Sequence, residues 1–257
     1  MTRKQRIGHA FGRAVGSYEA NASVQQLAAE RLAARIATLP LPARPRVLEI
    51  GCGSGFLTGA LARMTPQAEL AVSDLSPQMV AACSASLPGV HAAYLVMDGE
   101  RPCFADGLFD LVCSSLAVQW FDDLEGSLTR LCRLLKPGGH LAFSTLLSDS
   151  LAEWRRAHSE EGLTAGAPDF AAPTELLRLS PALVLSEERV VERHADGPAF
   201  VRILKSIGAA TPRRGRAPLS APELKRVLRR FEAAGAVTTY HLGYGVLRRP
   251  EAMDDAA

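Results

Sequence analysis

Hydrophobic positions along the chain follow two alternating patterns. Short, near-continuous apolar runs predict buried strands, and segments in which apolar residues recur every three or four positions predict helices. A helix predicted at 22–39 ends at "LPLPARP", before the first strand. The strands that follow are 46–50, 69–73, 92–96, 109–114 and 140–145, with helices at 55–64, 77–86 and 123–135. This alternation is typical of a doubly wound α/β fold, in which helices cover both faces of a mostly parallel sheet.

The pattern becomes less regular after Thr145. The segments predicted here are helices at 149–160, 173–180, 197–208 and 220–234 and strands at 187–194 and 237–248. We therefore expect a seven-stranded sheet in a single domain, 1–257, with a helical insertion or lid over its carboxyl edge. The expected parts are N-terminal cap helices (1–44), a central core (45–147), an insertion that contains strand six (148–236) and the final strand (237–248).

Composition and charge narrow the function classes. The chain has 257 residues, of which 47% are hydrophobic, and a formal net charge of +2. This small charge argues against nucleic acid or a membrane surface as the main partner. The five cysteines form no CxxC pair, which favours reduced thiols in the cytosol over disulfides or a metal site. No signal-like or membrane-spanning apolar stretch is visible, so we expect a cytoplasmic protein.

The stretch "VLEIGCGSGFLT", at 47–58, carries the first functional signal. Its three glycines, Gly51, Gly53 and Gly55, let the backbone turn tightly and approach a ligand after the first strand. A dinucleotide fingerprint requires a sixth-position glycine, where this chain has Phe56, and a phosphate-binding loop requires a Lys-Ser/Thr pair that is missing here. A pyrophosphate site and a nicotinamide oxidoreductase are therefore disfavoured, while a simple tight turn remains open.

Acidic residues at three strand positions add to this signal. Asp74 ends the second strand about 20 residues beyond the loop, where a carboxylate can bind both ribose hydroxyls. Asp98 follows the third strand and can accept a hydrogen bond from an adenine amine. Glu49 lies inside the first strand, where burial is costly unless a cation or a hydrogen bond meets it. Each residue alone is explained by a cap or turn, but together they favour a nucleoside ligand.

The combination of "EIGCGSG", Asp74, Asp98 and "LLKPGGHLAFST" (134–145) resembles the class I S-adenosylmethionine-dependent methyltransferases, which have a Rossmann-like fold. The resemblance covers about residues 45–145. It implies that S-adenosylmethionine is the cofactor, with S-adenosylhomocysteine as its product, and that the core 45–147 binds it. The contact residues implied are Glu49, Gly51, Cys52, Gly53, Gly55, Asp74, Leu75, Met79, Asp98, Gly99, Glu100, Ser114 and Leu116.

A narrower resemblance extends over nearly the whole chain. The segments "AFGRAVGSYEANASVQ" (10–25), "SSLAVQWFDDL" (114–124), "LAFSTL" (141–146), "LKSIGA" (204–209) and "TYHLGYGVL" (239–247) are similar to the malonyl-acyl-carrier-protein O-methyltransferases of biotin synthesis. This implies methylation of the free carboxylate of a malonyl thioester, carried by acyl carrier protein or by coenzyme A. Since that carboxylate is ionised at neutral pH, no general base is needed.

The expected acceptor site thus needs an aromatic wall, a polar or cationic anchor and a lid. Six residues are candidates for it: Tyr18, Gln119, Trp120, Arg202, Lys205 and His241. The last four have ordinary alternatives as a buried tryptophan, a solvated basic face and a structural histidine. Tyr18 is explained equally well by packing of the N-terminal segment, and Gln119 by capping.

The second half of the chain also carries a local excess of basic residues. An acidic carrier protein would be steered by them, and ordinary solubility is the alternative explanation. A nucleic-acid role is less attractive because Phe231 is the lone aromatic residue nearby. These basic residues are Arg213, Arg214, Arg216, Lys225, Arg226, Arg229 and Arg230.

Two other functions stay open at this point. One is a small-molecule C- or O-methyltransferase that acts on a quinone or phenol, and the other is a regulator that binds S-adenosylmethionine without catalysis.

Overall fold

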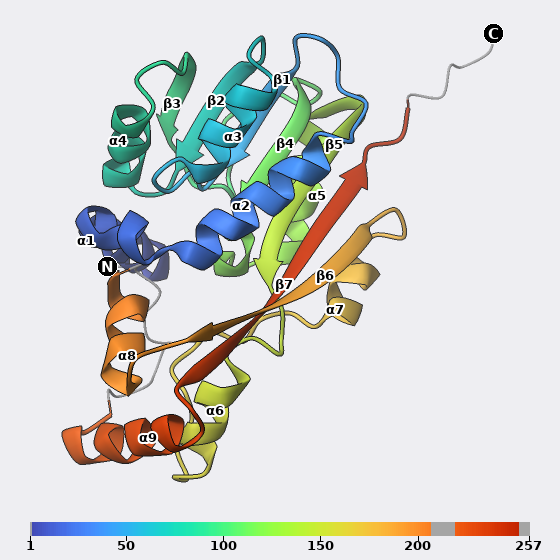
Figure 1. Ribbon diagram of the computed structural model, residues 1–257. Coiled ribbons are helices and arrows are strands. Elements are labelled where there is room, and N and C mark those ends of the chain that lie inside the picture. Colours follow the sequence, from blue (N-terminus) through green and yellow to red (C-terminus); the bar gives the residue numbers. More distant parts are fainter. Residues whose placement is uncertain (1, 207–218, 252–257) are drawn as a thin grey trace, which may run out of the picture.

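Seven strands form one sheet in the structure, a computed structural model that describes residues 2–206 and 219–251, apart from the side chains of residues 14 and 17–20 (Figure 1). Their order across the sheet is β3-β2-β1-β4-β5-β7-β6. The first five strands pair in parallel, and β7 is antiparallel to both β5 and β6. The strands are β1 (Arg46–Ile50), β2 (Glu69–Asp74), β3 (Ala92–Val96), β4 (Phe109–Ser115), β5 (Leu135–Leu146), β6 (Val184–Arg193) and β7 (Val237–Arg248).

Burial along the strands explains this order. In β1, the four residues 47–50 are all buried, as expected for a central strand covered on both faces. β6 alternates between exposed and half-buried positions and forms one edge of the sheet. The connection from β1 leads to β2 on one side, whereas β4 pairs with β1 on the other. The strand order therefore reverses between β1 and β4, and ligands of such sheets bind outside the carboxyl ends at this point.

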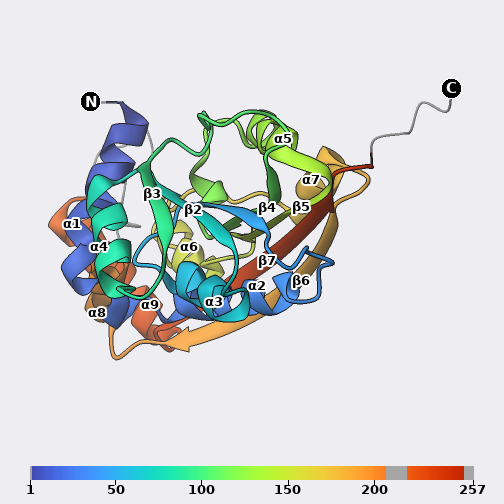
Figure 2. The same cartoon turned by 90° about the horizontal axis from the view of Figure 1, so that it is seen from above.

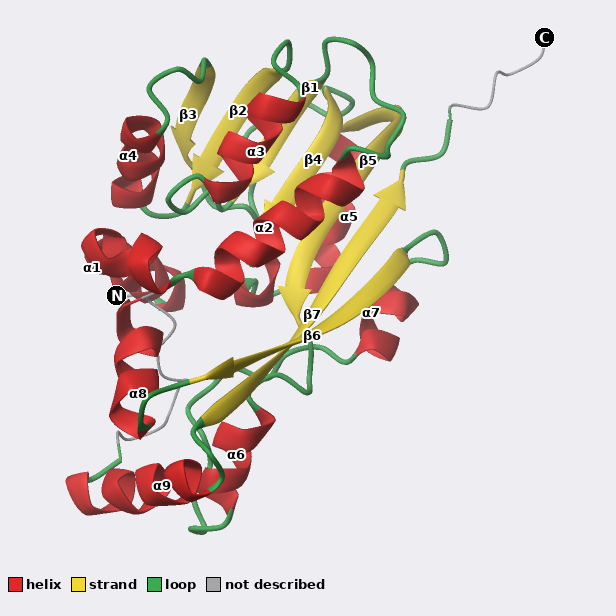
Figure 3. Cartoon of the chain, in the orientation of Figure 1, coloured by secondary structure: helices red, strands yellow, loops and turns green. Residues whose placement is uncertain are grey.

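Helices cover both faces of the sheet (Figure 3). Seen from above, α2 and α3 lie on one face, and α5 and α7 lie on the other (Figure 2). The helices are α1 (Arg3–Asn21), α2 (Ser23–Ile36), α3 (Phe56–Met64), α4 (Pro77–Ser86), α5 (Leu124–Leu134), α6 (Ala152–Ser159), α7 (Pro173–Leu179), α8 (Gly197–Ser206) and α9 (Ala221–Ala233), with a short 3-10 helix at Val118–Trp120. None of the helices in the described ranges is long and apolar enough to cross a bilayer.

The predicted doubly wound fold and its seven strands are confirmed, with differences in detail. β5 begins at Leu135 instead of residue 140, because "KPGG" continues in the sheet with a register shift against β4. The helix of residues 3–21 had no predicted range of its own. Thr2 caps it by accepting a hydrogen bond from the N–H of Gln5, whose side chain accepts from the N–H of Thr2.

The segments after β5 build a second packing centre around Trp154 of α6. Its ring contacts Phe200 of α8 edge-on at 5.2 Å and Phe231 of α9 at 5.4 Å. All three side chains are buried. Helix α8 in turn contacts α1, so α9, α8 and α1 form a continuous path to the carboxyl edge of the sheet (Figure 1).

Candidate functional site

The carboxyl ends of β1, β2, β3 and β4 meet at one edge of the sheet, and α1 covers this edge (Figure 1). A cavity of about 90 Å³ lies between them, and Ile7, Gly8 and Phe11 of α1 form one of its walls. We call it the main cavity. It is also lined by residues that the sequence predicted, namely Gly51, Gly53, Asp74, Leu75, Met79, Asp98, Gly99, Leu116 and Trp120.

The glycine loop between β1 and α3 is held against β2. The N–H groups of Gly51 and Cys52 both donate to the carbonyl of Ser73, at 2.8 and 2.9 Å. Gly51 has a φ of 74°, and a Cβ atom added to it would lie 2.4 Å from the Cβ of Ala117. Any other residue would therefore push the loop away from the end of β4.

Asp74 links the loop to the end of β2. Its Oδ2 accepts a hydrogen bond from the N–H of Gly53 at 3.0 Å, and its Oδ1 accepts from the N–H of Ser76 at 2.8 Å. Burial raises the pKa of the Asp74 carboxyl, and these two hydrogen bonds act against that rise. The second lone pairs of both oxygens remain available to hydroxyl donors from the main cavity.

Glu49 lies below the loop and is 2% exposed. Burial raises the pKa of the Glu49 carboxyl to about 8, so it is mainly protonated at neutral pH. The hydroxyl of Thr58 donates to its Oε2 at 2.7 Å, which meets the need for a partner that the sequence raised.

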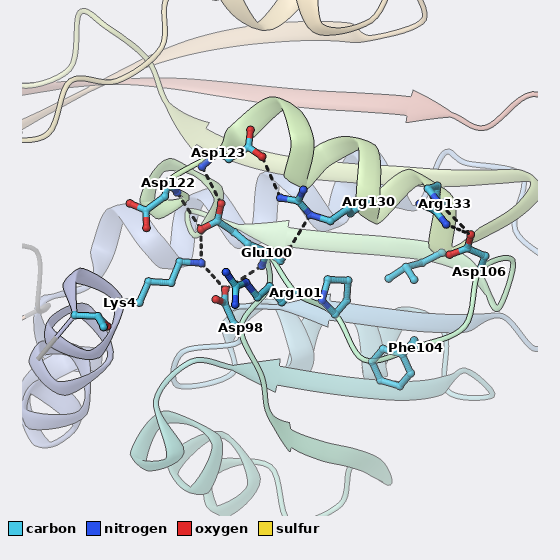
Figure 4. A pocket seen from close by; sticks show the side chains of 13 residues that line it. Lys4, Asp98, Glu100, Arg101, Phe104, Asp106, Asp122, Asp123, Arg130 and Arg133 are labelled. Carbon is cyan, nitrogen blue, oxygen red and sulfur yellow. Dashed lines mark hydrogen bonds and ion pairs between the residues drawn. The ribbon is translucent and has the colours of Figure 1, made fainter.

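Asp98 and Glu100 share a cation that the sequence analysis did not identify. Lys4 in the first turn of α1 places its Nζ 2.5 Å from Oδ1 of Asp98 and also forms an ion pair with Glu100 (Figure 4). Glu100 accepts hydrogen bonds from the backbone N–H groups of Asp122 and Asp123, at 3.0 and 2.8 Å. Although burial opposes it, these donors lower the pKa of the Glu100 carboxyl to about 2. Glu100 does not line the main cavity; it holds the start of α5.

A wider cleft of about 840 Å³ opens beside this ion pair (Figure 4). Its charged side chains largely neutralise one another: Arg130 pairs with Asp123 at 3.2 Å, and Arg133 pairs with Asp106 at 2.8 Å. The cleft is therefore a mixed-charge surface next to the main cavity.

A smaller cavity of about 30 Å³ lies on the other side of the loop, and it too is lined by Glu49, Gly51, Cys52 and Gly53. We call it the small cavity. Gln25 of α2 and Ser54 also line it, and neither was identified from the sequence. The Ser54 hydroxyl is buried and has no hydrogen-bond partner among the described residues. No sequence signal indicates these two polar groups, because α2 meets the loop only through the packing of the fold.

Two further predicted contact residues lie outside both cavities. Gly55 begins α3 in the left-handed conformation, with a φ of 102°. Ser114 is fully buried, and its hydroxyl donates to the carbonyl of Ile50 at 2.9 Å, which ties β4 to β1. Its neighbour Ser115 lines both cavities instead.

The candidates for the acceptor site separate into two groups. Trp120 lines the main cavity, and its ring meets Phe11 edge-on at 5.5 Å. Gln119 points toward β5, where the hydroxyl of Thr145 donates to its Oε1 at 3.5 Å. Tyr18 lies in α1, but its side chain is outside the described part of the structure, as are Arg213, Arg214 and Arg216.

The remaining candidates do not reach either cavity. Arg202 is 70% exposed on α8 and lies 3.8 Å from Asp196, and Lys205 is also exposed. His241 is buried in β7, where its Nε2 lies 2.7 Å from Oε2 of Glu187. The structure therefore brings Trp120 to the candidate site and leaves these three outside it.

Comparison with known proteins adds a family to this geometry. A family model described as a methyltransferase domain matches residues 48–143. The chain is 40% identical to the malonyl-[acyl-carrier protein] O-methyltransferase of Magnetococcus marinus, over 96% of this chain and 93% of that protein. It is 48% identical over 96% of its length to the biotin biosynthesis bifunctional protein BioCD of Bordetella avium, of which it spans only 53%.

Solved structures support the fold. The YcgJ protein of Bacillus subtilis superposes with a TM-score of 0.62, covering 86% of this chain and 98% of that one, at 16% sequence identity. At this identity the likeness concerns the fold alone.

Proposed function

The chain belongs to the malonyl-[acyl-carrier protein] O-methyltransferase family, and from this membership we propose that it transfers a methyl group from S-adenosylmethionine to the free carboxylate of a malonyl thioester on acyl carrier protein. The product is a malonyl methyl ester for biotin synthesis. The observation that carries the proposal is the 40% identity over nearly the full length of a relative with that name, including the segments outside the cofactor motifs.

The residues around the two cavities fit S-adenosylmethionine. Asp74 offers free lone pairs to the two ribose hydroxyls, and Asp98 offers its carboxylate to the adenine amine. The unpartnered Ser54 hydroxyl, with Gln25 and Glu49, faces the small cavity, where the amino-acid end would lie. We assign the main cavity to the adenosine and the small cavity to that end.

When bound, S-adenosylmethionine supplies a methyl group on a positively charged sulfur. The protein's task is then alignment and exclusion of water, since the malonate oxygen is already an anion. Good alignment alone is worth roughly 7–11 kcal/mol of barrier. Phe11 and Trp120 contribute apolar walls beside Gly51, and α1 covers them from solvent. Tyr18 keeps its proposed role as a further wall on the grounds of sequence.

Docking of the carrier protein is assigned to α8 and α9. Arg202, Lys205, Lys225 and Arg229 are exposed on these helices, and the last three have no ion-pair partner in the described ranges. A carrier protein is acidic and ends in a phosphate-linked arm, so charge attraction would orient it here. His241 is assigned a structural role, because Glu187 occupies its Nε2.

The test is methyl transfer by the purified protein from labelled S-adenosylmethionine to malonyl-carrier protein. We expect the malonyl group to gain one methyl as an ester that mild base removes. Malonyl-coenzyme A, a catechol and a quinol serve as competing acceptors in parallel reactions. Preference for a phenolic acceptor would favour the small-molecule methyltransferase, and cofactor binding without transfer to any acceptor would favour the regulator.

A further inference from the structure

Two of the five cysteines meet beneath the glycine loop. Cys52 lies within the loop and is 5% exposed, and Cys83 lies on α4 and is fully buried. Their thiol groups are hydrogen-bonded to each other. The Cys83 sulfur is also 3.4 Å from the hydroxyl of Thr58, and it would lie 3.0 Å from a Cβ atom on Gly55. The loop therefore packs directly on a pair of thiols.

The other cysteines are differently placed. Cys113 is fully buried in β4, and burial raises the pKa of its thiol. Cys132 is half-buried on α5, where burial raises the pKa of its thiol to about 11. Cys103 is exposed, and its sulfur contacts Met97 at 3.7 Å. Among the described residues, only Cys52 and Cys83 offer two sulfurs in contact.

From this contact we infer that Cys52 and Cys83 are a redox-sensitive pair, which a peroxide converts to a disulfide that disables the glycine loop. In the first step the Cys83 thiolate attacks one peroxide oxygen, the O–O bond breaks, and water and a sulfenic acid form. In the second step Cys52 displaces the sulfenic hydroxyl, which leaves as water, and the S–S bond forms. Two thiols and one hydrogen peroxide thus give one disulfide and two waters.

The roles of the two sulfurs follow from their hydrogen bond. It lowers the pKa of the Cys83 thiol, because the Cys52 S–H stabilises the Cys83 thiolate, and the pKa of the Cys52 thiol is raised in turn. Cys83 is therefore the attacking sulfur and Cys52 the resolving one. Cys52 lines the small cavity, which gives a molecule as small as hydrogen peroxide a path to the pair.

A disulfide would act on the loop through its neighbours. Cys52 stands between Gly51 and Gly53, and the N–H groups of all three residues are engaged by Ser73 and Asp74. Drawing the Cys52 sulfur to bonding distance of α4 shifts these backbone groups, since an S–S bond is about 2 Å long and a thiol contact is much longer. The loss of cofactor affinity that follows rests on the proposed function, whereas formation of the disulfide does not.

The test treats the reduced full-length protein with hydrogen peroxide and maps disulfides by peptide mass spectrometry without reduction. We expect a Cys52–Cys83 cross-linked peptide that has lost two hydrogens, and S-adenosylhomocysteine affinity that falls by at least about tenfold and returns with dithiothreitol. Cys83→Ser and Cys52→Ala should each lose this reversible response, and the matched control Cys103→Ser should retain it.

Three outcomes separate the proposals. Sulfonic acid on Cys103 without a Cys52–Cys83 peptide would overturn the redox pair. A cross-linked protein that binds S-adenosylhomocysteine as tightly as the reduced form would overturn its effect on the loop. Reduced protein that forms the cross-link but never binds the cofactor would contradict the proposed function and leave the thiol pair supported.

Discussion

The Oδ2 atom of Asp74 accepts a hydrogen bond from the backbone N–H of Gly53, which lies 21 residues earlier in the chain, at 3.0 Å. This bond joins the end of β2 to the glycine loop and points the carboxylate at the main cavity. We predict that Asp74→Ala weakens binding of S-adenosylmethionine by at least ~100-fold, or about 3 kcal/mol, because two charged hydrogen bonds to the ribose are lost. Isothermal titration calorimetry measures this directly.

Asp106→Ala is the matched control for that variant. It removes an exposed aspartate that pairs with Arg133 and lies outside the main cavity, so cofactor affinity should stay unchanged. Thermal unfolding of both variants shows whether Asp74→Ala is still folded. If folded Asp74→Ala binds the cofactor like the unmodified protein, the ribose assignment is wrong.

The conformation of Gly51 gives a second prediction. Gly51→Ala places a Cβ 2.4 Å from that of Ala117 at a φ of 74°, so the loop must shift. Gly107 is a suitable control, because its φ is 70° but no atom lies within 4 Å of an added Cβ. Both variants should lose about 1–2 kcal/mol of stability from the left-handed backbone. Only Gly51→Ala should lose cofactor affinity, and an equal loss in both would show that no clash is involved.

The buried Glu49 makes stability depend on pH. Its pKa is 4.5 when exposed and about 8 in the folded protein, so between these values the native state holds a proton that the unfolded state has released. Stability contributed by this group is therefore complete below pH 4.5 and decreases as pH rises toward 8. Its contribution falls by about 1.4 kcal/mol per pH unit within this window.

Glu49→Gln should remove this part of the pH dependence, since an amide does not titrate but can still accept from Thr58. Urea unfolding at about pH 5.5 and about pH 8 measures the slope, which should be flatter in the variant. Equal slopes for the two proteins would mean that Glu49 is not protonated in the fold.

Glu100 has the opposite pH dependence, although it is also buried. Its pKa falls from 4.5 to about 2 in the folded protein, because backbone N–H groups and Lys4 bind the charged form. Its stabilisation is present above pH 4.5 and is lost as pH falls toward 2. Glu100→Gln should cost about 2 kcal/mol at neutral pH, since the amide nitrogen cannot accept from these donors. Chemical unfolding should show this cost shrinking at low pH, and a cost independent of pH would contradict the assignment.

The sequence predicted the sheet and the acids at its edge because both depend on local patterns. Apolar runs identify β1 and β2, and strand ends fix Asp74 and Asp98 at the same edge. Lys4 and Gln25 were missed because their positions depend on how α1 and α2 pack across the sheet, which no local spacing encodes. Glu100 was assigned to the cofactor by resemblance, and only the structure reveals the backbone donors that occupy it.

The basic face of α9 gives the last prediction, because its cations fall into two classes. Arg226 and Arg230 are bound by Glu161 of the segment after α6, at 3.0 and 2.7 Å. Lys225 and Arg229 are exposed, and neither has an ion-pair partner in the described ranges. The first two cations hold α9 in place, and the other two are free to attract an acidic carrier protein.

Reversing the charge of Lys225 and Arg229 to glutamate should therefore lower kcat/KM for malonyl-carrier protein by about tenfold or more at low salt. The same variant should use malonyl-coenzyme A unchanged, because no protein surface is docked. Reversal of Arg44 and Arg63, which also lie on the surface, makes the same change in net charge away from α9 and serves as the control. High salt, at about 1 M, should remove the difference, since it screens exposed charges. An equal decrease in both double variants would show that net charge, and not α9, governs the encounter.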